Sequence, residues 1–204
     1  AQINSWLTAT FRAGTDVSNS NLKTWRAITD SKRADYNDEV GRVAEYSYYS
    51  SELNTDFLLS ANKNFGDDIS VNAILGHNMN MRDTRNMSAE VIGLDIPNFY
   101  NLANSSATPA VSGTISSRRL VGVYGSLDFG YKNYLFVNLS ARNDWSSTLP
   151  ADNKSFFYPG ASLSLIFTEL MDKNDILSYG KIRGGIAQTG KDADPYQIYA
   201  VLAQ

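Results

Sequence analysis

The strongest constraint on the fold is an alternation of apolar and polar side chains with a period of two residues. Between Asp68 and Arg82, every second residue from Ile69 to Met81 falls on one face, and that face is apolar apart from His77. Successive side chains of a β-strand point to opposite faces of the sheet, so the pattern predicts a strand with one apolar face. The predicted strand is longer than the usual globular strand of about 5–6 residues.

Six other segments repeat this alternation: 5–13, 48–62, 118–130, 134–142, 160–168 and 181–189. Their central apolar faces carry no Asp, Glu, Lys or Arg. A lysine or arginine on a lipid-facing strand costs roughly 2–4 kcal/mol at the bilayer midplane. The bare faces therefore favour membrane strands, and a soluble β-sandwich that binds glycans, with its polar face in water, is the alternative.

The opposite faces carry the charges. If the apolar faces meet lipid, the charged side chains point into the lumen of a barrel. We predict this position for Glu52, Asp56, Arg82, Arg118, Asp128, Lys181 and Arg183.

The connections between these segments differ in length. Those at 65–67 and 130–133 are short and the one at 169–179 is intermediate, whereas 14–40, 83–117 and 143–157 are long and are predicted to be loops. Short periplasmic turns and long extracellular loops are typical of outer-membrane barrels. We therefore predict an all-β fold, a segment of an antiparallel transmembrane β-barrel with short periplasmic turns and long extracellular loops.

Aromatic side chains gather near both ends of the predicted strands. Those near the shorter turns are Trp6, Phe65, Phe129, Tyr131, Tyr134, Phe167 and Tyr179, and those near the long loops are Tyr46, Tyr48, Tyr49, Phe156, Phe157 and Tyr158. Such rings prefer the membrane–water interface, so we expect two girdles. The long loops contain further aromatic rings, Trp25, Tyr36, Phe99 and Tyr100. These rings could stack on sugars, contact a lipoprotein or pack within the loops, and the sequence leaves these three alternatives open.

The composition limits the chemistry. There is no Cys, and His77 is the single His, which excludes a disulfide framework, a Cys nucleophile and a metal site built on two His. A net charge of −3 argues against a general nucleic-acid binder. Phosphate-binding loops and EF-hand spacing are absent, and we interpret Asp192 and Asp194 as solvated loop residues. We predict no catalytic residue, metal or cofactor, and hence no enzyme.

One motif is specific. The run RNDWSSTLP at 142–150, followed by SFFYP at 155–159, YGKIR at 179–183 and QTG at 188–190, resembles the SusC/RagA family of TonB-dependent outer-membrane transporters from Bacteroidetes. NTDFLL at 54–59 is similar to that family as well, so the resemblance extends over nearly the whole chain.

The resemblance implies a large barrel in the bacterial outer membrane, filled by an N-terminal plug and paired with a SusD-like surface lipoprotein. Such transporters import oligosaccharides or peptides with energy passed from TonB. The plug and the TonB box have no counterpart here, and seven predicted strands fall short of the roughly 22 of a plugged transporter. Since an open sheet leaves unpaired backbone groups in lipid, we expect residues 1–204 to be part of the C-terminal barrel domain of a larger polypeptide.

Two interpretations of the motif remain open. In the functional one, Arg142, Asn143, Asp144 and Trp145 lie at the lumen mouth, where they contact substrate or plug. In the structural one, Asp144 caps a turn and Trp145 anchors the loop. We favour the structural interpretation, because a motif shared across a family suits its architecture better than cargo that differs between members. The cargo, glycan or peptide, is left open.

Overall fold

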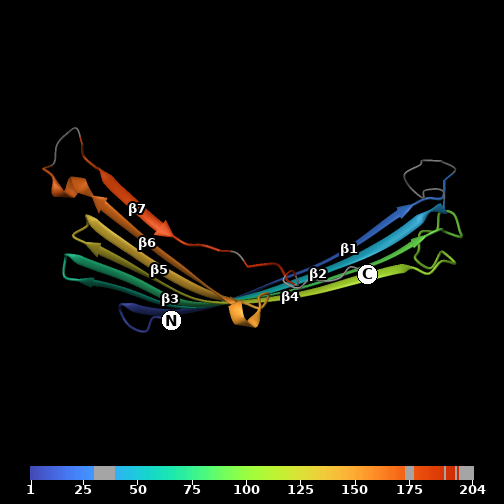
Figure 1. Ribbon diagram of the computed structural model, residues 1–204, viewed down its shortest axis with the longest axis horizontal. Coiled ribbons are helices and arrows are strands. Elements are labelled where there is room, and N and C mark those ends of the chain that lie inside the picture. Colours follow the sequence, from blue (N-terminus) through green and yellow to red (C-terminus); the bar gives the residue numbers. More distant parts are fainter. Residues whose placement is uncertain (30–39, 173–176, 191, 196, 198–204) are drawn as a thin grey trace. The chain divides into compact units, whose positions relative to one another are not determined.

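The computed structural model describes residues 1–29, 40–172, 177–190, 192–195 and 197. All strands of this part belong to one seven-stranded sheet, in which they follow one another in chain order (Figure 1). The strands are β1 Leu7–Arg26, β2 Arg42–Phe65, β3 Ile69–Ile92, β4 Ala110–Tyr131, β5 Leu135–Ser146, β6 Ser155–Ile166 and β7 Lys181–Ala187. Strands β4 to β7 pair antiparallel, which confirms the all-β antiparallel prediction.

The described connections include the short 3₁₀ helices η2 at Ala151–Asn153 and η3 at Phe167–Leu170. Within the described residues, no helix is both long enough and apolar enough to cross a membrane.

The strands continue beyond the predicted boundaries. β1 runs on to Arg26, β3 runs on to Ile92 and β4 begins at Ala110, so parts of the predicted loops are strand. Backbone N–H and C=O groups pair between strands whatever the polarity of the side chains. The apolar alternation therefore marks only the part of a strand with an apolar face, and it misses extensions that are polar on both faces.

The short turns agree with the prediction. Lys132 and Asn133 connect β4 to β5 with φ angles of 48° and 60°, and the Tyr134 amide donates to the Tyr131 carbonyl at 3.2 Å. Two successive positive φ values are typical of the type I′ turn, whose twist matches that of the flanking strands. Gly66, with φ of 64°, provides the left-handed residue of the β2–β3 turn.

The chain divides into two compact units. Unit 1 comprises Ala1–Gly14, Leu53–Met81 and Arg118–Gln204, and unit 2 comprises Thr15–Glu52 and Arg82–Ser117. We describe each of them separately.

Unit 2 has a small hydrophobic core. Its buried members are Val43, Val91 and Leu94, and the partly buried Ile28, Tyr100 and Leu102 pack against them. Gly41 has a φ of 74°, and a Cβ there would lie 3.0 Å from side-chain atoms of Ile28 and Leu94. The core therefore requires a glycine at this position both for its backbone conformation and for space.

The β3–β4 connection is held by Asn104, whose side chain is only 4% exposed. Its amide nitrogen donates to the carbonyls of Ile96 and Phe99, and its oxygen accepts from the Ile96 amide at 2.9 Å. One buried amide thus satisfies several backbone groups of the loop.

Unit 1 has a different kind of apolar surface. The buried hydrophobic residues of the described chain (Val43, Ala44, Val91 and Leu94) all lie in unit 2. Large apolar side chains of unit 1 are exposed instead, including Phe11, Leu75, Leu163 and Ile186, the last at 80%. A β-sandwich would bury such side chains between two sheets, whereas the described strands form one. The structure therefore disfavours the sandwich.

Candidate functional site

The strand register shows which side chains of unit 1 share a face. Tyr124 lies opposite Arg142, which lies opposite Tyr158, and cross-strand partners of an antiparallel pair project to the same side. We call the side that carries these three residues the polar face. The neighbouring register, Val123 with Asn143 and Phe157, defines the apolar face.

This register divides the motif residues. Arg142 and Asp144 lie on the polar face, whereas Asn143 and Trp145 lie on the apolar face, with Trp145 opposite Val121 and Ser155. The four residues therefore do not form one cluster, because consecutive residues of a strand alternate in direction. Only Arg142 and Asp144 are therefore on the face that the prediction assigns to a lumen.

Arg142 and Asp144 form an ion pair on this face. The Arg142 Nε lies 2.8 Å and 2.9 Å from the two Asp144 carboxylate oxygens, and its guanidinium lies 5.3 Å from the centroid of the Tyr124 ring. The pair lies over Gly122, where a Cβ would clash with an Asp144 carboxylate oxygen. The Tyr124 ring lies over Gly76 in the same way. The two glycines thus make room for a layer of large polar side chains.

A second cluster surrounds Asp192, which follows β7. Its carboxylate accepts from Arg118 Nε at 3.0 Å and Nη2 at 2.6 Å, from Ser146 Oγ at 2.7 Å and from Thr148 Oγ1 at 3.2 Å. The Asp192 side chain is 10% exposed. The interpretation of Asp192 as a solvated loop residue is therefore wrong: this carboxylate anchors its segment to Arg118 within β4 and to Ser146 at the end of β5.

Burial and hydrogen bonding act on Asp192 in opposite directions. Desolvation favours its neutral form, but the hydrogen bonds from Ser146, Arg118 and Thr148 favour the carboxylate, and together they hold its pKa below the ordinary value. The anion is therefore the form that fits this site.

The Ser–Ser–Thr part of the motif holds this anchor. Ser146 and Thr148 are 2% and 6% exposed, and their hydroxyl oxygens lie 2.8 Å apart. The Ser147 Oγ accepts from the Arg119 amide at 2.8 Å, and the Ser147 amide donates to the Arg119 carbonyl at 2.9 Å. These contacts favour the structural interpretation of the motif. The sequence prediction did not include Ser146 and Thr148 among the site residues. The only sequence indication was two hydroxyl side chains two residues apart at the point where the apolar alternation ends.

The other predicted lumen-facing residues are placed as follows. On the polar face, Asp128 accepts from its cross-strand neighbour Asn138 at 2.6 Å, and Asp56 accepts from Asn78 at 2.8 Å. Lys181 and Arg183 lie on the same face of β7, with Arg183 opposite Ser164. In unit 2, Arg82 pairs with Glu52 at 2.7 Å.

The aromatic residues near the short turns lie beside cations. Lys63 Nζ lies 5.7 Å from the Trp6 ring and 5.2 Å from the Phe65 ring, and the Tyr131 and Tyr134 rings pack edge to face at 5.6 Å. This arrangement suits an interface girdle.

The aromatic residues near the long loops divide between the faces. Phe156 and Tyr158 stack on the polar face, whereas Phe157 projects from the apolar face and is 58% exposed. Alternation thus leaves only Phe157 of these three for a girdle.

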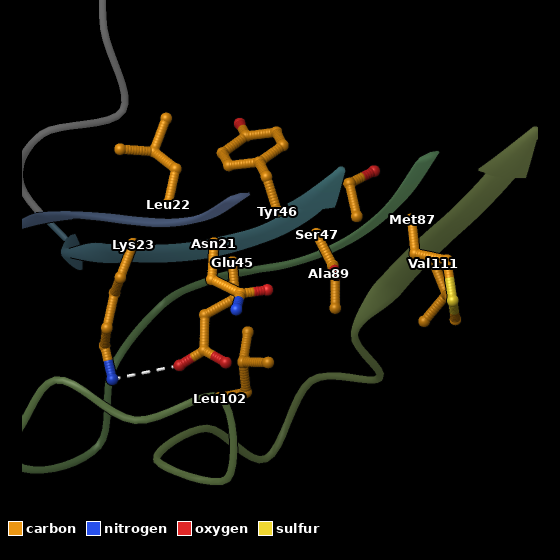
Figure 2. A pocket seen from close by; sticks show the side chains of 11 residues that line it. Asn21, Leu22, Lys23, Glu45, Tyr46, Ser47, Met87, Ala89, Leu102 and Val111 are labelled. Carbon is orange, nitrogen blue, oxygen red and sulfur yellow. Dashed lines mark ion pairs between the residues drawn. The ribbon is translucent and has the colours of Figure 1, made fainter. Parts of the chain in front are cut away.

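Unit 2 contains an open groove of about 420 Å³ between strand residues and the β3–β4 loop. Figure 2 shows that the Lys23 and Glu45 side chains extend to the side of the strands on which Leu102 lies, whereas Leu22 and Tyr46 extend to the opposite side. Lys23 and Glu45 form an ion pair at 2.9 Å. Of the loop rings, Trp25 packs against Tyr100 at 5.6 Å, Phe99 is 51% exposed, and Tyr36 lies outside the described residues.

The described residues hold no group of three or more His, Asp or Glu side chains that would bind a metal ion. His77 is exposed on β3. The polar face carries the Arg142–Asp144 and Arg118–Asp192 ion pairs together with hydrogen-bonded amides such as Asn138.

Comparison with known proteins agrees with this picture. The chain is 25% identical over 175 residues to TonB-dependent receptor P26 of Formosa agariphila, a match that covers 83% of this chain and 18% of that protein. It is 27% identical over 106 residues to TonB-dependent receptor P3 of the same organism, covering 50% and 10%. No family model matches. The chain thus spans less than a fifth of the first of these relatives.

Solved structures share the fold. A structure of the RagAB peptide importer in the "closed-closed" state matches 98% of this chain with a TM-score of 0.87 at 15% identity, and the match covers 22% of that chain. A structure of the RagAB peptide transporter matches 89% of this chain with a TM-score of 0.81 at 14% identity, covering 20% of that chain. The predicted resemblance to SusC/RagA-like TonB-dependent transporters is confirmed. These relatives are receptors and transporters, which agrees with the prediction that the protein is not an enzyme.

Proposed function

We propose that this chain is part of the barrel wall of a TonB-dependent importer in the bacterial outer membrane, within the C-terminal barrel domain of a larger polypeptide. The observation that carries the proposal is the two-faced sheet of unit 1. One face exposes large apolar side chains, and the other carries the Arg142–Asp144 and Arg118–Asp192 pairs. A barrel wall needs this combination of an outer face in lipid and an inner face in water.

The proposed partners follow from the similarity to TonB-dependent receptors and to the RagAB structures. We propose that the complete transporter works with a SusD-like surface lipoprotein and receives energy from TonB through a region outside this sequence. Two solved structures with this fold are of a peptide transporter and a peptide importer, which favours peptides as cargo, and oligosaccharides are the other class. No step of bond making or breaking is involved, since import requires binding and gated passage.

A tagged full-length protein in its source cells tests both parts. We expect it in the outer-membrane fraction, in a complex from which a lipoprotein co-purifies after mild detergent extraction. Recovery of the protein in the soluble periplasm would contradict the barrel assignment. Loss of uptake on deletion of the gene, measured separately with labelled peptides and labelled oligosaccharides, identifies the cargo class.

A further inference from the structure

A hollow on the polar face between β6 and β7 has the composition of an anion site. Its volume is about 520 Å³, and its lining includes Ser162, Ser164, Lys181, Arg183 and Gly185. Ser164 lies directly opposite Arg183 in the register, and Ser162 lies opposite Gly185. Since alternate residues of a strand share a face, all five side-chain positions belong to the same side of the sheet.

The shape of the hollow follows from residue size. A Cβ on Gly185 would lie 2.9 Å from the Ser162 Cβ and 3.1 Å from the Ala161 carbonyl oxygen, so only glycine fits this close approach. Glycine and two serines thus make a shallow floor, and the long side chains of Lys181 and Arg183 form its wall.

The charge of the hollow is not compensated within the described part of the chain. Arg118 and Arg142, on the same face, hold Asp192 and Asp144 at 2.6 Å and 2.8 Å. Among the described residues, no carboxylate lies within 4.0 Å of Lys181 or Arg183, and Lys181 Nζ lies 5.9 Å from the centroid of the Phe136 ring. Lys181 and Arg183 lie two residues apart on one face of β7, so their positive charges repel each other, and a bound anion offsets this repulsion.

The Ser164 hydroxyl points to the same conclusion. Its oxygen is buried and has no hydrogen-bond partner in the described part of the protein. A buried polar group without a hydrogen-bond partner is destabilising, so such a group calls for a donor or an acceptor. A hydroxyl, an ammonium and a guanidinium around one hollow supply the donors that a carboxylate accepts.

We propose that this hollow binds a carboxylate side chain carried by the part of the polypeptide that lies outside this sequence. The inference rests on the proposed function, since it takes the polar face to be the lumen face. The match to the first relative covers 18% of that protein, so a protein of that size has ample chain left to occupy a lumen. A carboxylate of a peptide cargo has the same chemistry, and the experiment separates the two sources.

A photo-crosslinking amino acid placed at position 181 or 183 of the full-length protein, in outer membranes, tests the inference. We expect crosslinks, in the absence of cargo, to a segment of the same polypeptide that contains Asp or Glu, identified by mass spectrometry. Position 182 is the matched control, because Ile182 lies on the apolar face and is 65% exposed. We expect the control to crosslink to lipid.

The outcomes are distinct. Crosslinks from 181 and 183 that appear only with added peptide cargo would overturn the assignment in favour of cargo, and no protein crosslink from either position would overturn the site itself. Lipid crosslinks at 182 in the same sample show that the barrel assignment holds in either case. Once the acidic partner residue is identified, a double variant with Lys181→Glu and Arg183→Glu should make the partner segment sensitive to proteolysis. Replacing the partner acid with Lys in that variant should restore the resistance of the segment.

Discussion

The carboxylate of Asp192 accepts hydrogen bonds from Arg118, Ser146 and Thr148 in unit 1. Its carboxylate joins the segment after β7 to Arg118 on β4 and to Ser146 at the end of β5, across 46 residues of sequence. Hydrogen bonds to ionised groups are roughly twice as strong as neutral ones, so this carboxylate matters more for local order than the exposed Asp194.

Asp192→Asn should release this segment. The amide keeps the shape but loses the charge that Arg118 requires, and a hydrogen bond to a charged group contributes about 1.5–3 kcal/mol. We expect hydrogen exchange of the backbone around residues 188–190 to become about 30-fold faster, which corresponds to about 2 kcal/mol. Asp194→Asn is the matched control and should leave exchange unchanged; equal exchange rates in both variants would contradict the anchor.

The same contact predicts a dependence on pH. Because the folded-state pKa of Asp192 is depressed, its stabilisation is fully present above the unfolded-state pKa of about 3.9 and is lost as the pH falls through the lower folded-state value. Exchange at 188–190, corrected for its intrinsic pH dependence, should therefore stay constant from neutral pH to about pH 4 and accelerate below it. Acceleration already between pH 5 and 7 would assign the anchor to another group.

At the scale of the strand, the assignment of faces can be tested on β4. Leu127 lies on the apolar face opposite Leu139, and Ser126 lies on the polar face opposite Ser140. A membrane crossing takes about 9–11 residues of tilted strand, so a strand that ends at the Tyr131 girdle reaches the bilayer midplane near residue 126. Leu127→Lys should cost about 2–4 kcal/mol there, whereas Ser126→Lys meets water.

The measurement is the fraction of full-length protein that assembles into outer membranes and keeps its compact form in a heat-modifiability gel. We expect a clear decrease for Leu127→Lys and near-normal assembly for Ser126→Lys. The reverse order would show that the two faces are exchanged.

At the scale of the molecule, the sheet has two outer strands, β1 and β7, whose outward edges have no partner among the described strands. Unpaired edges are costly in lipid and invite association in water. Residues 1–204 expressed alone without detergent should therefore form soluble aggregates and show no cooperative melting. A monomer by size-exclusion chromatography with a sharp thermal transition in circular dichroism would restore the soluble sandwich as the fold.

The alternation of side chains determined a large part of this architecture. It located all seven strands, the two tight turns and the assignment of Asp128, Lys181 and Arg183 to one kind of face, because a period of two is a local property of each strand. The prediction that Arg142 to Trp145 lie together came from the motif and not from the alternation. Applied to the motif, the period of two separates Arg142 from Asn143. The alternation does not predict the strand extensions, because their pairing depends on backbone groups that every residue carries.

By itself, then, the sequence determined that this protein is a sheet of two-faced strands with a transporter-like motif. Only the tertiary structure decided which distant residues meet: Asp192 with Ser146 and Thr148, and Val43 with Val91 and Leu94 in the core of unit 2. The physical reason is the range of the signal. Alternation reports on the direction of neighbouring side chains, whereas these contacts depend on strand register and on loops that return to the sheet, which no local pattern encodes.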